Sequence, residues 1–145
     1  MTEPLIRAAM AEDAPALERL IDQLGYEAAA ADVAERLKAM QRDGRLVLVA
    51  VLDGRVVGCL STSVMQVLHR PAPVGRISMM VVDATVRNRG IGAKLVRAAE
   101  RALVAEGCQL VEVTSNLART EAHRFYERLG YERSSVRLSR DARID

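Results

Sequence analysis

The sequence predicts a single α/β domain over residues 1–145, in which a central mixed sheet carries helices on both faces. Three observations support this prediction. Asp53-Gly54, a strong short hairpin signal, joins two β-rich runs. The apolar run at 76–83 suits a strand that is buried on both faces. A helical pattern and another short strand follow it, as in a strand–helix–strand crossover, so the expected element order is βααβββαβαβ.

The first third of the chain predicts one strand and two helices. LIRAA at 5–9 favours a short strand, and Glu12 to Pro15 offers acidic capping with a proline in the first helical turn. Apolar residues then recur at three- and four-residue spacing until Gly25, which is placed to end the helix. These residues are Leu17, Leu20, Ile21 and Leu24. A second helix is expected from about residue 30 to Asp43-Gly44, with Val33, Leu37 and Met40 along one stripe.

The remainder of the chain predicts alternating helices and strands. Residues 91–106 have the pattern of a helix with one apolar face, and the glycine that follows is placed to end it. LVEVTS at 110–115 is typical of a strand, and residues 119–129 are typical of a last helix. SSVRLS at 134–139 alternates polar and apolar residues, which predicts a final edge strand.

Charge and composition exclude several classes of function. The formal net charge is only +2, from 21 basic and 19 acidic residues that are spread along the chain, so no nucleic-acid footprint is expected. One Phe, three Tyr and no Trp leave little for base stacking. The N-terminus lacks the pattern of a signal peptide, and no apolar run approaches the ~20 residues of a membrane helix. We expect a cytoplasmic protein without nucleic-acid or membrane partners.

The two cysteines indicate packing and no metal or redox site. Cys59 and Cys108 lie far apart in apolar surroundings, without a CxxC or Cys/His spacing. We expect reduced thiols, which is consistent with the cytoplasm.

VRNRGIGAKL at 86–95 places two arginines and two glycines at the start of a predicted helix. Glycines let a ligand approach the backbone, and the first N–H groups of a helix attract negative charge, so a phosphate is expected here. A plain turn would also explain the glycines. A P-loop is excluded because GxxxxGK is absent. A dinucleotide fingerprint fits poorly, because Leu95 holds its third glycine position and six residues separate Asp83 from Gly90.

A fourth interpretation comes from resemblance to a known family. Arg87-x-x-Gly90-x-Gly92 resembles the acetyl-CoA signature Q/R-x-x-G-x-G/A of the GCN5-related N-acetyltransferase (GNAT) superfamily. Asn116 at a strand end and AHRFYERLGY at 122–131 resemble the later segment A-x-x-F-Y-x-x-x-G-F/Y of the same superfamily. The resemblance covers nearly the whole chain. It implies the GNAT fold and the transfer of an acetyl group from acetyl-CoA to an amine.

The resemblance also implies a set of site residues. The diphosphate of acetyl-CoA is expected on the glycine loop and the helix start, with the pantetheine arm along the preceding strand. The implied cofactor-binding residues are Met80, Val81, Val82, Arg87, Asn88, Arg89, Gly90, Ile91, Gly92, Ala93 and Asn116. Tyr126 is expected to protonate the departing thiolate as general acid, while Phe125 points to the core. The amine attacks the thioester directly, a backbone N–H steadies the oxyanion, and no metal is implied.

The general base and the acceptor stay open. Many relatives use a glutamate on the strand before the signature, but Ile77-Ser78-Met79-Met80 contains no carboxylate. The candidate substitutes are Glu112, His69, Glu27 and Asp83. The acceptor is expected to be a small-molecule or peptide amine, and a homodimer is compatible with the resemblance. The missing glutamate leaves two alternatives, a non-catalytic module that senses acyl-CoA and a structural protein that keeps only the fold.

Overall fold

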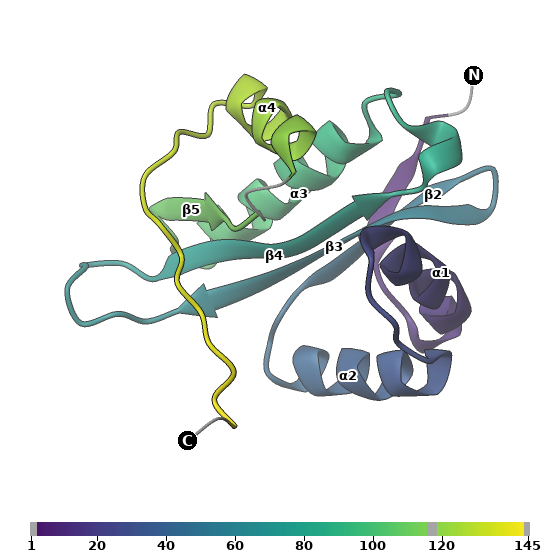
Figure 1. Cartoon of the computed structure of the whole chain (residues 1–145), viewed down its shortest axis with the longest axis horizontal. Helices are drawn as coiled ribbons and strands as arrows, with labels where there is room; N and C mark the ends of the chain where they lie inside the picture. Colours follow the sequence, from purple (N-terminus) through teal and green to yellow (C-terminus); the bar gives the residue numbers. More distant parts are fainter. Residues whose placement is uncertain (1–2, 116–118, 144–145) are drawn as a thin grey trace. The chain divides into compact units, whose positions relative to one another are not determined.

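The computed structural model describes residues 3–115 and 119–143, and the chain divides into two compact units, residues 1–114 and 115–145. The second unit holds one helix, α4 (Thr120–Arg128). The first unit holds, in chain order, β1 (Leu5–Ala8), the 3₁₀ turn η1 (Ala11–Asp13), α1 (Ala14–Leu24), α2 (Ala30–Arg42), β2 (Val47–Leu52), β3 (Arg55–Met65), β4 (Val74–Val82), the 3₁₀ turn η2 (Ala84–Val86), α3 (Ile91–Ala105) and β5 (Leu110–Val113) (Figure 1).

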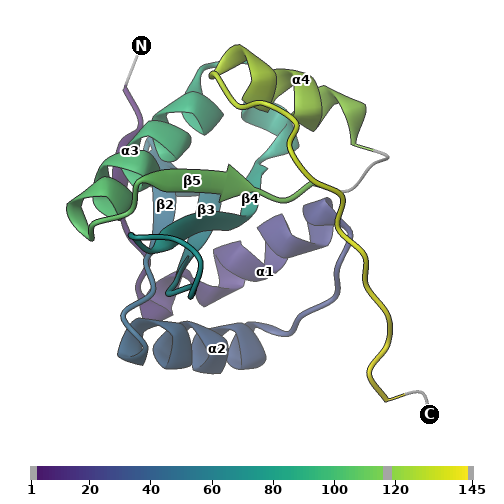
Figure 2. The ribbon, with the colours of Figure 1, turned by 90° about the vertical axis from the view of Figure 1, so that its left-hand side faces the viewer.

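The first unit is built on one sheet with the strand order β1-β2-β3-β4-β5. The first four strands are antiparallel neighbours, and β5 pairs in parallel with β4 after the crossover through α3. Figure 2 shows α1 and α2 on one face of this sheet and α3 on the other. The predicted mixed sheet, its hairpin at Asp53-Gly54 and its crossover are therefore confirmed.

The apolar stripes of α1 and α2 meet the sheet in one core cluster. Leu17 and Leu20 of α1 and Val33 and Leu37 of α2 are all buried there. The strands contribute Val47, Val49, Val56, Cys59 and Val81 to the same cluster. Each of the larger side chains contributes about 1.5–3 kcal/mol through removal from water. The helical spacing read from the sequence thus corresponds to the face that is buried.

On the opposite face, α3 lies close to the sheet because two strand positions are glycine. A Cβ at Gly58 of β3 would lie 3.1 Å from Leu95 Cδ1, and a Cβ at Gly75 of β4 would lie 2.9 Å from Leu103 Cδ1. Leu95 and Leu103 are both fully buried. These two glycines therefore set the height at which α3 lies over β3 and β4.

The final edge strand predicted at 134–139 is wrong. None of the described residues after α4 is in a strand, and β5 pairs only with β4 among the described residues. Val136 and Leu138, the two apolar residues of the alternation, are 82% and 90% exposed. Two apolar residues bury too little surface to hold a strand in place when no neighbouring side chains cover them. Separately, no helix among the described residues is long and apolar enough to cross a membrane.

An ion pair connects β1 to the start of α1. The Arg7 guanidinium donates to both carboxylate oxygens of Asp13, at 2.8 and 3.0 Å, and the Met10 N–H donates to the same carboxylate at 2.7 Å. Asp13 is buried, so its charge depends on these three donors. The hydrogen bond from Arg7 is the main cause that holds the pKa of Asp13 below its ordinary value.

We predict that Asp13→Asn lowers the free energy of unfolding by about 1–2 kcal/mol, because it removes the charge while Arg7 stays partly solvated. The folded-state pKa of Asp13 is depressed, so its contribution is present above an unfolded pKa of about 3.9 and is lost as pH falls through the folded value. Urea unfolding at pH 7 and pH 3 measures both effects. Glu35→Gln, which alters only an exposed pair with Lys38, is the control. Equal stabilities at pH 7 would contradict the assignment.

Candidate functional site

A β-bulge changes the partners of β4 halfway along its length. β5 pairs with β4 only up to Ile77, which faces Val113. On the other side, Thr62 of β3 faces Ile77 while Ser61 faces Met79, so Ser78 is the extra residue of a bulge. Beyond the bulge β4 pairs with β3 alone among the described residues. We call Ser78–Val82 the open edge of β4, because its backbone groups on the β5 side have no strand partner.

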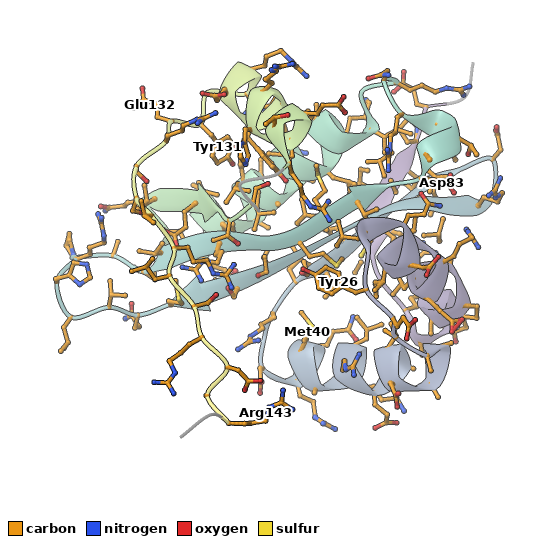
Figure 3. The ribbon with its side chains drawn as sticks, viewed as in Figure 1. Tyr26, Met40, Asp83, Tyr131, Glu132 and Arg143 are labelled. Carbon is orange, nitrogen blue, oxygen red and sulfur yellow. The ribbon has the colours of Figure 1, made fainter. Side chains whose placement is uncertain are left out.

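The segment after the open edge is fixed by a buried carboxylate, Asp83. Its Oδ1 accepts hydrogen bonds from the Thr85 N–H at 2.9 Å and from the Thr85 hydroxyl at 2.8 Å. The next N–H, that of Ala84, donates to Gln23 of α1 at 2.9 Å. The hydrogen bonds from Thr85 are the main cause of a lowered pKa at Asp83, which therefore stays ionised at neutral pH. Figure 3 shows Asp83 at the end of β4.

The glycine loop turns the chain sharply into α3. Asn88 and Gly90 both have positive φ angles, 66° and 77°, and Gly90 is the N-cap of the helix without a capping side chain. The first helical hydrogen bond runs from the Lys94 N–H to the Gly90 carbonyl. The N–H groups of the first turn before Lys94 therefore lack helical partners and can bind an anion.

The predicted donor-site residues of the first unit lie in two groups. Arg87, Asn88 and Arg89 are exposed on the loop, whereas Ile91, the first residue of α3, is buried. The Arg87 Nε also donates to the Val82 carbonyl at 3.2 Å, which ties the loop back to β4.

On the open edge, Val81 points into the core cluster beneath α1 and α2. Met80 and Val82 are half-buried. Because the side chains of Val81 and Ile91 are buried, only the backbone groups of these two residues could contact a ligand.

Two predicted residues lie beyond the first unit. Asn116 falls outside the described residues. Tyr126 is the buried residue of α4, while Phe125 is half-buried, which is the reverse of the expectation that Phe125 points to the core. The Tyr126 ring makes edge-on contacts with Phe125 at 5.1 Å and Tyr131 at 5.8 Å between centroids. Burial raises the pKa of Tyr126 to about 12.

The structure separates the four candidate bases. Asp83 is buried, its Oδ1 accepts two hydrogen bonds from Thr85, and its Oδ2 lies 3.7 Å from Arg55 Nη2, so its carboxylate holds the loop. His69 and Glu27 lie exposed in loops. Glu112 is half-exposed on β5, one residue before pairing with β4 ends. Of the four, Glu112 alone combines a position beside the open edge with partial removal from water.

Glu112 is paired with Arg76, a residue that the sequence analysis did not single out. Arg76 Nε donates to Glu112 Oε1 at 2.9 Å, and Nη2 donates to the same oxygen at 2.5 Å. The two residues face each other in the β4–β5 register. One arginine in an apolar strand and one glutamate in the next, LVEV, were the available signal. These two residues could not be paired from the sequence, because their contact depends on the register between β4 and β5.

A second acidic region lies where α1 turns into α2. Glu18, Asp22, Tyr26 and Glu27 line an open depression there, together with one basic residue, Arg19, whose Nη2 donates to the Val56 carbonyl at 3.3 Å. Tyr26 is 65% exposed, which is high for an aromatic side chain. Figure 3 shows it at the end of α1 on the face of the sheet that α1 and α2 cover. The depression suits a cation better than an anion.

The cysteine thiols are not set up as nucleophiles. Cys59 is 2% exposed, and burial raises its pKa to about 12. Burial also raises the pKa of Cys108. A reactive cysteine requires a lowered pKa and access to the substrate, and both thiols lack these properties. Among residues 3–115 and 119–143, no group of three His, Cys, Asp or Glu side chains could hold a metal ion.

Comparison with known proteins gives a consistent result. The profile of the acetyltransferase (GNAT) family matches residues 12–131. An aminoalkylphosphonate N-acetyltransferase of Salmonella typhimurium is 33% identical over 140 residues, which cover 93% of this chain and 89% of the relative. Glucosamine-6-phosphate N-acetyltransferase from Arabidopsis thaliana superposes with a TM-score of 0.86 at 21% identity, covering 97% of this chain and 99% of that chain.

An aminoglycoside N-acetyltransferase in complex with CoA superposes with a TM-score of 0.86 at 20% identity, covering 99% of this chain and 97% of that chain. These two structural likenesses confirm the predicted fold.

We predict that Asp83→Asn loosens the segment from Ala84 to Gly90. The variant weakens two hydrogen bonds to an ionised carboxylate, so amide exchange there should accelerate by at least about tenfold. Hydrogen-exchange mass spectrometry of peptides that cover the loop measures this. Asp53→Asn in the exposed β2–β3 turn is the matched control and should leave the loop unchanged. Identical exchange in parent and Asp83→Asn would show that the carboxylate does not order the loop.

Proposed function

The chain belongs to the acetyltransferase (GNAT) family, and on that premise we propose how its residues divide the work of an acetyl-CoA-dependent N-acetyltransferase. The enzyme moves the acetyl group of acetyl-CoA to an amine, as its family and its named relatives do. The single observation that supports our assignment is the open edge of β4, which leads through Asp83 into an uncapped helix start. An extended thioester arm needs the first feature and a diphosphate needs the second.

We assign the donor site to both features. The diphosphate would accept hydrogen bonds from the N–H groups at the start of α3, around Gly92 and Ala93. Arg87, Asn88 and Arg89 would contact the outer phosphates, and Gly90 and Ile91 would contribute backbone only. The pantetheine arm would pair with the backbone of Met80, Val81 and Val82 along the open edge. Asn116 keeps its proposed role as a further contact to acetyl-CoA.

We propose direct transfer in a ternary complex. Glu112 takes one proton from the acceptor ammonium, directly or through a water molecule, and leaves a neutral amine. The amine nitrogen attacks the thioester carbonyl carbon, so a C–N bond forms and a backbone N–H of the open edge steadies the oxyanion. The C–S bond then breaks, the nitrogen releases its second proton to solvent, and the thiolate takes up one proton from solvent. The high pKa of the Cys59 thiol argues against an acyl-enzyme.

Tyr126 is the proposed donor to the departing thiolate, on the grounds of resemblance and of its own chemistry. A pKa of about 12 keeps its hydroxyl protonated at neutral pH. The same pKa exceeds the ~8.5 of a thiol, so complete transfer from tyrosine to sulfur is uphill. The hydroxyl is therefore best suited to donate a hydrogen bond to sulfur while the C–S bond breaks, and the thiolate then takes its proton from solvent.

We propose a small primary amine as acceptor. The Salmonella relative is named for aminoalkylphosphonates, which join an amine to an anionic group, and this supports an acceptor of the same kind. A location in the cytoplasm is proposed because both cysteines are free and buried. A homodimer is a further proposal, which light scattering of the purified protein tests directly.

A thiol-release screen tests the proposed function. Acetyl-CoA is mixed with the protein and, in parallel, with aminoalkylphosphonates, amino sugars, amino acids, alkylamines and peptides with a free N-terminus. We expect release of CoA above the rate without amine for at least one class. Acetyl-CoA that binds but releases no thiol with any amine would favour the acyl-CoA-sensing alternative.

We predict that Gly92→Asp weakens acetyl-CoA binding by at least about tenfold, because it places a side chain and a negative charge beside the proposed diphosphate position. Calorimetric titration with acetyl-CoA gives the dissociation constant. Val104→Asp adds the same charge at an exposed position of α3, away from its first turn, and is the matched control. If Gly92→Asp binds as tightly as the parent, the diphosphate lies elsewhere.

We predict that Tyr126→Phe lowers kcat by about 10²-fold while the KM for acetyl-CoA changes little, since only the hydroxyl is removed. Steady-state kinetics with an acceptor from the screen measures both constants. In the parent, ionisation of Tyr126 should not depress kcat between pH 7 and 10, because burial raises its pKa to about 12. Tyr131→Phe, at the neighbouring ring, is the control. Full turnover of Tyr126→Phe would leave this tyrosine a structural role only.

A further inference from the structure

We propose that Arg76 is the anion-binding residue of the acceptor site, which selects amines that carry a nearby phosphonate, phosphate or carboxylate group. The inference rests on the proposed function, because it adds a specificity residue beside the proposed base Glu112. It makes the acceptor a small zwitterion held at two points, with its ammonium on Glu112 and its anion on Arg76.

The first argument is the face of the sheet on which the pair lies. A Cβ at Gly75 would point at Leu103 of α3, so the next residue, Arg76, projects from the opposite face. Glu112 faces Arg76 in register and bonds to it, so it projects from that face too. The proposed diphosphate position is at the start of α3. The Arg76–Glu112 pair therefore projects from the face of the sheet opposite to α3.

The second argument is the hydrogen-bonding capacity that the Arg76–Glu112 pair leaves unused. Nε and Nη2 of Arg76 both donate to one oxygen, Oε1 of Glu112. A guanidinium has five N–H donors, and a carboxylate has two oxygens. Within the part of the chain that the structure describes, the second oxygen of Glu112 and the Nη1 group of Arg76 have no hydrogen-bond partner. The free carboxylate oxygen can accept a hydrogen bond from an ammonium, and the Nη1 group can donate to an anion, without breaking the existing contact.

The third argument is that stability does not explain the pair. Arg76 and Glu112 side chains are 34% and 36% exposed, and ion pairs of that exposure contribute little to folding. Two β-branched residues would fit these strands better. Both charges instead stay partly exposed to solvent. They lie one residue before the pairing of β4 with β5 ends at Ile77 and Val113. That position adjoins the open edge on which the thioester arm is proposed to lie.

Two amines of similar length test the inference. 2-Aminoethylphosphonate carries an anion and propylamine carries none. We expect Arg76→Gln to raise the KM for 2-aminoethylphosphonate about 10- to 100-fold, the range for losing one or two charge-assisted hydrogen bonds. The KM values for propylamine and acetyl-CoA should stay within about twofold, which also shows that the variant folds. Arg76→Lys should recover part of the loss, and the exposed Arg101→Gln is the control.

Equal losses with both amines would overturn the inference, since Arg76 would then only position Glu112. If the parent turns over neither amine, calorimetric titration of 2-aminoethylphosphonate into the protein with CoA decides the question. Binding that Arg76→Gln weakens at least tenfold supports the anion subsite, and absence of binding overturns it. The proposed function fails by a different result, namely absence of thiol release with every amine of the screen.

Discussion

The site depends on one constraint, the change of partner that β4 undergoes at Ser78. Before the bulge β4 is held on both sides, by Thr62 of β3 and by the parallel strand β5. Beyond it, among the residues that the structure describes, β3 alone pairs with the strand, and the backbone on the other side is where we propose that the ligand binds. An unpaired strand edge is ordinarily a liability for a folded protein. Here β4 and β5 are paired with each other up to Ile77, so the unpaired edge begins between two strands of one sheet, which suits the proposed ligand arm.

The position of α3 carries this constraint to the glycine loop. Gly58 and Gly75 allow Leu95 and Leu103 to lie directly on β3 and β4, so the helix start is fixed relative to the open edge. Between the two, the Asp83 N–H donates to the Val57 carbonyl at 2.7 Å, and the Asp83 carboxylate holds the turn that follows. The loop is thus tied to the sheet at one end and to a rigid helix at the other. A diphosphate would meet N–H groups that are already oriented, which reduces the entropic cost of binding.

The sequence predicted the parts of this arrangement that depend on local patterns. The stripe of α1, the turn at Asp53-Gly54 and the glycine loop each arise from a few neighbouring residues, and each is present in the structure. The bulge at Ser78 and the Arg76–Glu112 pair depend on strand register, which has no local signature; the two residues of the pair are 36 apart in the sequence. The strand expected at 134–139 failed for the same reason, because its alternation was local while a strand needs a partner.

The charges of the first unit differ between the two proposed substrate positions. Arg87 and Arg89 stand beside the start of α3, where negative phosphates are proposed, while Glu18, Asp22 and Glu27 line the depression at the α1–α2 turn. Such a division would draw a polyanion to one side and an ammonium to the other, and it would keep each out of the other's place. Acidic surroundings also repel a bare anion. An amine that carries an anion would therefore be attracted through its ammonium and retained through a cation on the same face of the sheet. Arg76, facing the same side as α1 and α2, is a cation of that kind.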